Sequence, residues 1–353
     1  MDAVRLCIVG FGGMGQGMIR RAQNVAGVAV VAAVEVRTDG RKRAAAEFKL
    51  KTYETLEQML DAGAADAVYI ATPNKFHAEQ AIQCLKAGVH VFCEKPMAMN
   101  AAEGERMVAA ARKARRKLTF NLSYRATGPA RALKNAVDAG LLGDVYFART
   151  GWLRNRGIPW RGWFNDKALS GGGPLIDLGV HRIDLALWLM GYPRPVSVTG
   201  VTYDMLGKAI ARKAGRPYTV EDLAAGFVRF ENGAALSLET SWAANSELGE
   251  DMYTYVYGTK AGATHRSVGG RYDFECRIWG ETAGTFSETV LQPAPAPDHL
   301  EGFVRAIRED GPVPVEPEDI LKVQRIIDAL YRSAETGAEV KLRSGRAARK
   351  RSR

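Results

Sequence analysis

The sequence contains few cysteines and no long apolar run. Its four cysteines, Cys7, Cys84, Cys93 and Cys276, form no CxxC pair and no metal-ligand spacing, so we expect inert core thiols and no metal site. No stretch approaches the roughly 18 to 20 consecutive apolar residues of a membrane span. The first residues lead directly into a strand pattern, without a charged segment and a cleavage site. We therefore expect a cytoplasmic protein that does not enter a membrane.

Excess positive charge is also absent from most of the chain. The net charge is +10, but residues 341–353, KLRSGRAARKRSR, carry seven Lys or Arg and no acid, which leaves +3 (ten less seven) on residues 1–340. A solvated terminus is the favoured interpretation of this basic tail, and an arm that binds a polyanion is the alternative. The body of the protein gives no reason to expect a nucleic-acid partner.

The 353 residues are enough for two domains, and 46% hydrophobic with 25% charged residues is ordinary for a globular protein. Residues 1–122 alternate short apolar strands with helical patterns, which predicts a doubly wound parallel sheet of the Rossmann type. Residues 123–340 begin with a helix and continue in β-rich runs, which predicts an α+β domain on an open, largely antiparallel mixed sheet. An amphipathic helix over 316–337 is expected to pack back toward the first domain.

A GxGxxG spacing marks the first strand-to-helix turn. Gly10, Gly12 and Gly15 follow an apolar strand over 5–9 and open a helix, and Glu35 ends the next strand about 20 residues after Gly15. In this context the glycines let the backbone approach a pyrophosphate, and Glu35 would accept hydrogen bonds from ribose hydroxyls. The alternative is a glycine-rich loop with a solvated glutamate. NAD is the expected cofactor, and NADP is possible because Arg37 lies close by.

Later strands also end in polar residues. The carboxyl ends of parallel strands meet at one edge of the sheet, so these residues should converge on one crevice there, next to the glycine turn. ATPN occupies 71–74, EKP occupies 94–96, and Asn121 follows the strand over 118–120. Lys95 could present a fixed donor to a substrate oxygen, or it could be a surface lysine before a turn. The residues predicted to bind the cofactor are Gly10, Phe11, Gly12, Gly13, Met14, Gly15, Glu35, Arg37, Ala71, Thr72, Pro73, Asn74, His77, Glu94, Lys95 and Asn121.

The stretch SGGGPLIDLGVHRIDLALWLMG, residues 170–191, places three titratable groups in an apolar helix. Asp177, His181 and Asp184 have offsets of four and three, which put them on one helical face. Buried charge requires a partner or a use, so a site near the crevice is predicted. The alternative is a purely structural helix, with a core histidine whose hydrogen bonds are satisfied and two carboxylates that act as caps.

Aromatic and hydrogen-bonding side chains gather in residues 151–173, between the two predicted domains. Such side chains suit a sugar ring, although tryptophans are also common in cores. The predicted substrate contacts are Tyr124, Arg125, Trp152, Arg154, Arg156, Trp163, Asp177 and His181.

Taken together, GFGGMG, ATPN with HAEQA, EKP and GGGPLIDLGVHRIDL resemble the glucose-fructose oxidoreductase, inositol dehydrogenase and MocA family along nearly the whole chain. The resemblance implies that Lys95, Asp177 and His181 form the catalytic set. It also implies that the uncovered sheet face makes a subunit contact, so a homodimer or homotetramer is expected.

The expected function is hydride transfer between a nicotinamide and a ring secondary hydroxyl of a sugar, cyclitol or sugar derivative. His181 would act as general base, Lys95 would polarise the reacting oxygen, and Asp177 would balance the charge. Asp184 is expected to orient the imidazole. Two alternatives stay open: an enzyme that uses tightly bound NAD transiently for elimination or hydrolysis of a glycoside, and a non-enzymatic ligand sensor.

Overall fold

The structure is a computed structural model that describes residues 3–160, 162–270 and 272–342. Its first part is a parallel six-stranded sheet in the order β3-β2-β1-β4-β5-β6. The strands are β1 (Val4–Val9), β2 (Val28–Val34), β3 (Lys51–Tyr53), β4 (Ala67–Ile70), β5 (His90–Cys93) and β6 (Leu118–Phe120). The intervening helices are α1 (Gly13–Ala22), α2 (Thr38–Phe48), α3 (Leu56–Asp61), the 3-10 turn η1 (Asn74–Phe76), α4 (His77–Lys86) and α5 (Ala101–Ala114). The predicted doubly wound sheet is confirmed.

Continuous apolar stretches form the central strands of this sheet because both of its faces are covered. All four residues of β4 are buried, as is typical of a parallel strand between helices. One of the covering helices comes from far along the chain. This helix, α10 (His299–Arg308), packs Leu300, Phe303 and Val304 into the hydrophobic core on one face of the six-stranded sheet. The ring of Phe303 lies 5.5 Å from that of Phe92 on β5.

The second part is a nine-stranded sheet in the order β14-β13-β12-β11-β7-β10-β9-β8-β15, antiparallel except between β7 and β10. This confirms the predicted mixed, largely antiparallel sheet. Its strands are β7 (Val145–Arg154), β8 (Pro195–Tyr203), β9 (Leu223–Phe230), β10 (Ala235–Ser241), β11 (Glu250–Gly258), β12 (Ala261–Ser267), β13 (Phe274–Thr282), β14 (Thr285–Leu291) and β15 (Val340–Lys341). The remaining elements are η2 (Ser123–Ala126), α6 (Gly128–Asp138), α7 (Lys167–Ser170), the π-helical turn η3 (Leu175–Gly179), α8 (Val180–Leu189), α9 (Met205–Lys213) and α11 (Pro317–Thr336).

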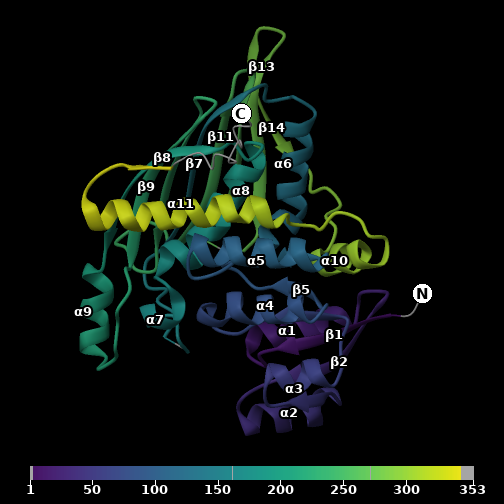
Figure 1. Cartoon of the computed structure of the whole chain (residues 1–353). Coiled ribbons are helices and arrows are strands. Elements are labelled where there is room, and N and C mark those ends of the chain that lie inside the picture. The colour runs from purple at the N-terminus through teal and green to yellow at the C-terminus, as the bar shows by residue number, and fades with distance from the viewer. Residues whose placement is uncertain (1–2, 161, 271, 343–353) are drawn as a thin grey trace, which may run out of the picture.

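The long helix α11 lies between the two sheets and joins them (Figure 1). On one side it packs on β8 and α8, and on the other side it packs on α5. Arg112 of α5 pairs with Glu318 at 2.6 Å, and the carboxylate of Asp328 accepts the amide of Ala101 at 2.7 Å. The predicted packing of this helix toward the first domain is confirmed.

Of the predicted basic tail, only residues 341 and 342 lie in the described part of the chain. Lys341 pairs with Ser197 in the sheet, so β15 extends one residue into the predicted tail. The other predicted tail residues that carry the basic cluster, 343–353, lie outside the described part of the chain.

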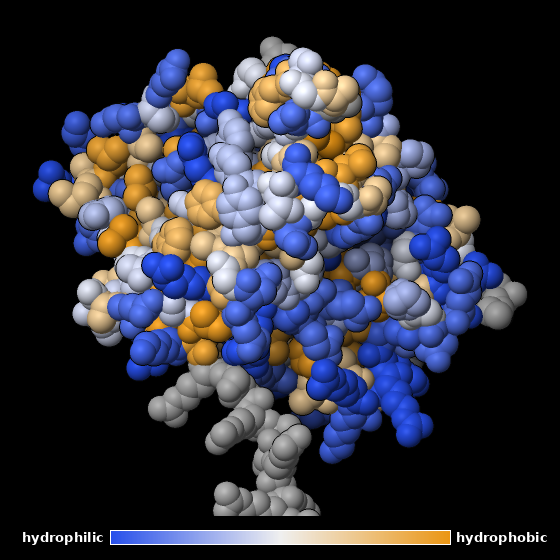
Figure 2. Space-filling view, turned by 90° about the horizontal axis from the view of Figure 1, so that it is seen from above, coloured by the Kyte–Doolittle hydropathy of each residue, from blue (hydrophilic) through white to orange (hydrophobic). Residues whose placement is uncertain are grey.

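The surface carries apolar and polar side chains that are mixed with one another over the face seen in Figure 2. Among the described helices, none is both long and apolar enough to cross a membrane.

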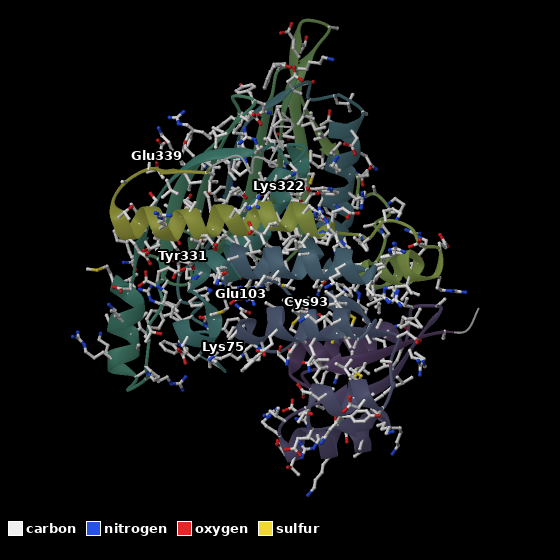
Figure 3. All side chains as sticks on the ribbon, in the orientation of Figure 1. Lys75, Cys93, Glu103, Lys322, Tyr331 and Glu339 are labelled. Carbon is white, nitrogen blue, oxygen red and sulfur yellow. The ribbon has the colours of Figure 1, made fainter. Side chains whose placement is uncertain are left out.

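The four cysteines are free and buried, as predicted. Figure 3 places Cys93 inside the first part of the molecule, at the end of β5. Burial raises the pKa of the Cys84 thiol to about 12, so this thiol stays protonated and unreactive. Within the described ranges, no three His, Cys, Asp or Glu side chains gather in an arrangement that could hold a metal ion.

Candidate active site

The glycine turn between β1 and α1 has the shape needed for a dinucleotide. Gly10 has a φ of +96°, and a Cβ atom on Gly15 would lie 2.1 Å from the carbonyl oxygen of Gly10. Only glycine permits this close packing of helix and strand. At Gly12 and Gly13 an added Cβ would meet nothing within 4 Å, so the outer surface of the turn is open. The turn therefore fits a pyrophosphate at the start of α1.

Glu35 is tied to this turn from the end of β2. Its Oε2 accepts the amide of Phe11 at 3.1 Å, and its Oε1 accepts both the amide and the Nε of Arg37, at 3.0 and 3.1 Å. The Glu35 side chain is 8% exposed, whereas that of Arg37 is 60% exposed. The carboxylate thus lies beside the glycine turn, with Arg37 held against it.

Glu94 and Asn121, both predicted cofactor residues, meet each other at the ends of β5 and β6. The amide of Asn121 donates to Glu94 Oε1 at 2.7 Å, and the hydroxyl of Tyr69 donates to the same oxygen. The second carboxylate oxygen of Glu94 accepts the backbone amide of Lys95 at 3.1 Å. This buried network fixes the backbone from which the Lys95 side chain extends.

Two other predicted cofactor residues connect strand ends. The imidazole of His77 lies 2.9 Å from the carbonyl of Thr72 and 2.8 Å from that of Pro96, so it bridges the loops after β4 and β5. Asn74 donates to the carbonyl of Ser170 at 2.8 Å, which ties the first part of the molecule to the end of α7. These contacts give His77 and Asn74 positions at the crevice, and their cofactor roles stay predictions.

Lys95 and Asp177 meet across the two parts of the chain. Lys95 Nζ lies 2.6 Å from Asp177 Oδ1 and also donates to the backbone carbonyl of Asp177 at 3.1 Å. The other carboxylate oxygen, Oδ2, accepts the indole N–H of Trp242 at 3.1 Å. Sequence reasoning missed Trp242 because it follows β10, far from either motif. Together these bonds hold the carboxylate in one orientation.

The glycines before Asp177 form the expected close-approach loop, but the sequence did not reveal its partner, Glu221. A Cβ on Gly173 would lie 2.1 Å from the carbonyl oxygen of Glu221. The Glu221 carboxylate accepts the amides of Gly173 at 2.8 Å and Leu175 at 3.1 Å, and also the hydroxyl of Tyr331 at 2.9 Å. Tyr331, labelled in Figure 3, reaches this loop from α11. Glu221 therefore caps the turn that carries Asp177.

His181 follows on the first turn of α8, after the π-helical turn, where a regular helix was predicted. Its ring centroid lies 5.1 Å from that of Tyr124 and 6.0 Å from that of Trp152. The buried Nδ1 atom has no hydrogen-bond partner among the described residues. Burial, followed by the charges of Lys95, Arg182 and Arg154, holds the pKa of His181 well below its usual range. A neutral imidazole can accept a proton.

The expectation that Asp184 orients this imidazole is wrong. Both carboxylate oxygens of Asp184 bind the guanidinium of Arg125, and Oδ1 also accepts the hydroxyl of Tyr192 at 2.7 Å. His181 and Asp184 both lie in the regular helix α8, so the π-helical turn before it does not explain the error; the carboxylate is occupied by Arg125 and Tyr192. The Arg125 side chain, predicted to contact substrate, is only 5% exposed in this pair. Its position makes it a structural partner of Asp184.

Arg182 is buried next to His181 in an unusual way. All three guanidinium nitrogens lack a hydrogen-bond partner within the described chain. The guanidinium lies instead over aromatic rings, 4.4 Å from the centroid of Tyr124 and 5.6 Å from that of Trp152. Burial lowers the pKa of Arg182 to about 10, which leaves it cationic at neutral pH. A buried positive charge therefore lies against the same aromatic rings that neighbour His181.

The other predicted substrate residues differ in their surroundings. Glu250 Oε1 accepts Trp152 Nε1 and Arg154 Nε, each at 2.6 Å, so these two residues form one wall. Arg156 is exposed and bonds to the carbonyl of Ala244 and the side chain of Asn245. Trp163 stacks on Phe164 with centroids 4.4 Å apart. Arg161, in the same predicted stretch, lies outside the described residues. The substrate roles of this set stay predictions.

Two family models match the chain. The N-terminal model, described as an oxidoreductase family with an NAD-binding Rossmann fold, matches residues 4–122. The GFO/IDH/MocA C-terminal domain matches residues 130–264. The chain belongs to the Gfo/Idh/MocA family. The resemblance seen in the motifs is confirmed, and the protein is an NAD(P)-dependent oxidoreductase.

Individual family members are similar over most of their length. The D-glucoside 3-dehydrogenase of Escherichia coli is 34% identical over 298 residues, which cover 81% of this chain and 82% of that protein. The inositol 2-dehydrogenase of Leifsonia xyli is 27% identical, covering 90% and 96%. The crystal structure of the aldose-aldose oxidoreductase from Caulobacter crescentus matches with a TM-score of 0.82 and 28% identity, covering 97% and 100%.

Proposed function

We propose that this oxidoreductase transfers hydride between a nicotinamide and a ring secondary hydroxyl of a sugar, cyclitol or sugar derivative. The observation that carries the proposal is the 2.6 Å contact between Lys95 Nζ and Asp177 Oδ1, near the neutral imidazole of His181. Names of relatives support the substrate class, since they include a D-glucoside 3-dehydrogenase and an inositol 2-dehydrogenase.

The proposed chemistry assigns one task to each of three side chains. His181 takes the hydroxyl proton because its imidazole is held neutral by burial and by neighbouring cations. Lys95 donates to the same oxygen and stabilises its developing negative charge. Asp177 orients Lys95, and the indole N–H of Trp242 fixes the direction of the Asp177 carboxylate.

The residues of the glycine turn would hold the cofactor, with Gly12 and Gly13 against the pyrophosphate and Glu35 near the adenosine ribose. When bound, the nicotinamide supplies the hydride acceptor for the substrate carbon. Tyr124, Trp152 and Arg154 would line the sugar site, since aromatic faces and fixed donors suit a polyol ring.

We also propose that the protein works in the cytoplasm as a homodimer or homotetramer. The helices α6, α8 and α11 pack on one face of the nine-stranded sheet, and the opposite face carries Arg149, Tyr253 and Tyr255. The molar mass measured by light scattering tests the assembly, and a monomer at all concentrations would contradict it.

A substrate screen tests the proposed activity. Aldoses, glycosides and inositols are offered with NAD and with NADP, and the reduced nicotinamide is followed by absorbance. We expect turnover on at least one carbohydrate, abolished in the Lys95→Ala variant and retained in Lys86→Ala, an exposed lysine on α4. Saturable sugar binding without any change in the nicotinamide would favour the sensor. Product formation with tightly held NAD and no net reduction would favour the transient use of the cofactor.

A further inference from the structure

A cavity of about 260 Å³ lies where α10 meets α6 and α8. Its wall includes three arginines, one tryptophan and one histidine: Arg125, Arg131, Arg305, Trp188 and His299. We call this the arginine cavity. It draws on segments far apart in the chain, because α10 packs on the first sheet and α6 and α8 pack on the second (Figure 1).

The positive charges of this wall exceed the negative ones. Arg125 is neutralised by Asp184, but the side chains of Arg131 and Arg305 form no ion pair with any described residue. The buried Nε of Arg131 has no hydrogen-bond partner in the described chain. Leaving such a donor unsatisfied costs free energy, so an anionic acceptor at this position would be stabilising.

The acidic side chain of the wall, Asp298, is already engaged. It pairs with Arg21, and its Oδ1 accepts the amides of Leu300 at 2.7 Å and Glu301 at 3.3 Å as the N-cap of α10. Asp298 therefore does not satisfy Arg131 or Arg305. The guanidinium groups of Arg131 and Arg305 therefore line the cavity without a carboxylate partner in the described part of the chain.

The two ring side chains of the wall suit a polar, partly flat ligand. The guanidinium of Arg131 lies 5.1 Å from the centroid of Trp188, which orients it against the indole face. His299 is 4% exposed, and its Nδ1 has no hydrogen-bond partner among the described residues. Burial and the nearby charges of Arg125, Arg21 and Arg131 lower the pKa of His299 to about 3, so its imidazole is neutral.

We propose that the arginine cavity binds a small metabolite through a phosphate or carboxylate group. Arg131 and Arg305 supply charged donors for the anion, and the indole of Trp188 supplies an apolar surface for the rest of the molecule. The site is separate from the glycine turn and from the Lys95–Asp177 pair. Because Arg125 binds Asp184 on α8, an occupant would lie against the helix that carries His181. The proposal does not depend on which sugar is the substrate.

Calorimetric titration of the NADH-saturated protein tests this site, because NADH keeps the probes out of the glycine turn. Inorganic phosphate and malonate are titrated separately at constant ionic strength. We expect one molecule of at least one probe to bind per chain. Binding of phosphate alone identifies a phosphate site, and binding of malonate alone identifies a carboxylate site.

The test variant is Arg131→Met with Arg305→Met, and its matched control is Arg229→Met with Arg308→Met. The control also removes two positive charges. Arg308 lies on α10, as Arg305 does, and Arg229 lies over an aromatic ring, that of Phe227, as Arg131 lies over Trp188. We expect the test variant to weaken binding by about tenfold or more, and the control to bind as the wild type does. Arg305→Met alone, at an exposed position, covers the case in which the double variant does not fold. Absence of binding to the wild type, or equal binding by wild type and the Arg305 variants, would overturn the proposal.

Discussion

The guanidinium of Arg182 lies 4.4 Å from the ring centroid of Tyr124, and the imidazole of His181 lies 5.1 Å from the same centroid. The cation therefore acts on the imidazole without a hydrogen bond between them. Among the described residues this buried charge has no carboxylate partner, an arrangement that costs stability unless it serves another purpose. Its contribution to the low pKa of His181 offers such a purpose.

Replacing Arg182 by Met should move the pH dependence of the reaction. A nearby positive charge disfavours the protonated imidazole, so its removal raises the pKa of His181. Since the base must be unprotonated, the acid limb of kcat/KM should shift to higher pH. The free energy of unfolding should be unchanged or higher, because an apolar side chain replaces an unpaired charge. Profiles of kcat/KM and denaturation curves measure both effects, with Arg182→Lys as the charged control. An unmoved acid limb would show that Arg182 has only a packing role.

The proposed general base and oxyanion donor are tested directly by Lys95→Ala and His181→Asn. Each change removes a group that acts on the reacting oxygen, so kcat should fall by about 10² to 10⁴. The dissociation constant of NADH, measured by fluorescence, should change little, because neither residue carries the glycine turn. Either variant that keeps more than half of the wild-type kcat would contradict its assigned role.

The sequence was a good guide wherever function depends on neighbours along the chain. The glycine spacing, Glu35 at a strand end and the EKP motif all follow from the alternation of strand and helix. Residues that act across the fold were not predictable in this way. Glu221, just before β9, and Trp242, just after β10, reach this segment only through the tertiary fold, in which β10 packs on η3. Their local sequence does not indicate these partners.

The segment around His181 explains the clearest failure of sequence reasoning. Offsets of four and three residues describe one face only in a regular α-helix. The π-helical turn before α8 alters the offset between Asp177 and His181. The error over Asp184 has another cause, because Arg125, a buried arginine from η2, binds its carboxylate. A charge-pairing partner 59 residues away in sequence cannot be read from a helical pattern.

The glycine loop provides a stability prediction with an internal control. Gly173→Ala places a methyl group 2.1 Å from a backbone oxygen of Glu221, which cannot rotate away. We expect a loss of about 1–3 kcal/mol in unfolding free energy and lower kcat, because the loop leads directly to Asp177. In contrast, Gly17→Ala on the exposed side of α1 meets nothing within 4 Å and should stabilise the helix by about 0.5–1 kcal/mol. Equal stability of the two variants, measured by chemical denaturation, would contradict the close approach.

Cofactor preference depends on Glu35 and Arg37, which the structure places in direct contact. Glu35 repels a 2′-phosphate and can accept hydrogen bonds from ribose hydroxyls, so we expect kcat/KM to favour NAD over NADP by about tenfold or more. Glu35→Ser removes the repulsion and releases the Arg37 guanidinium, which lies 3.1 Å from Glu35 Oε1 in the wild type. The released cation can then bind the phosphate, so the preference should shift toward NADP. Some affinity for both cofactors should be lost, because the amide of Phe11 also loses its acceptor.

The control for this prediction is Glu47→Ser, at an exposed carboxylate that pairs with Arg43 on the same helix, and it should leave the ratio of kcat/KM for the two cofactors unchanged. Steady-state kinetics with both cofactors decide the matter: equal use by the wild type, or no shift in Glu35→Ser, would mean that Glu35 does not face the ribose.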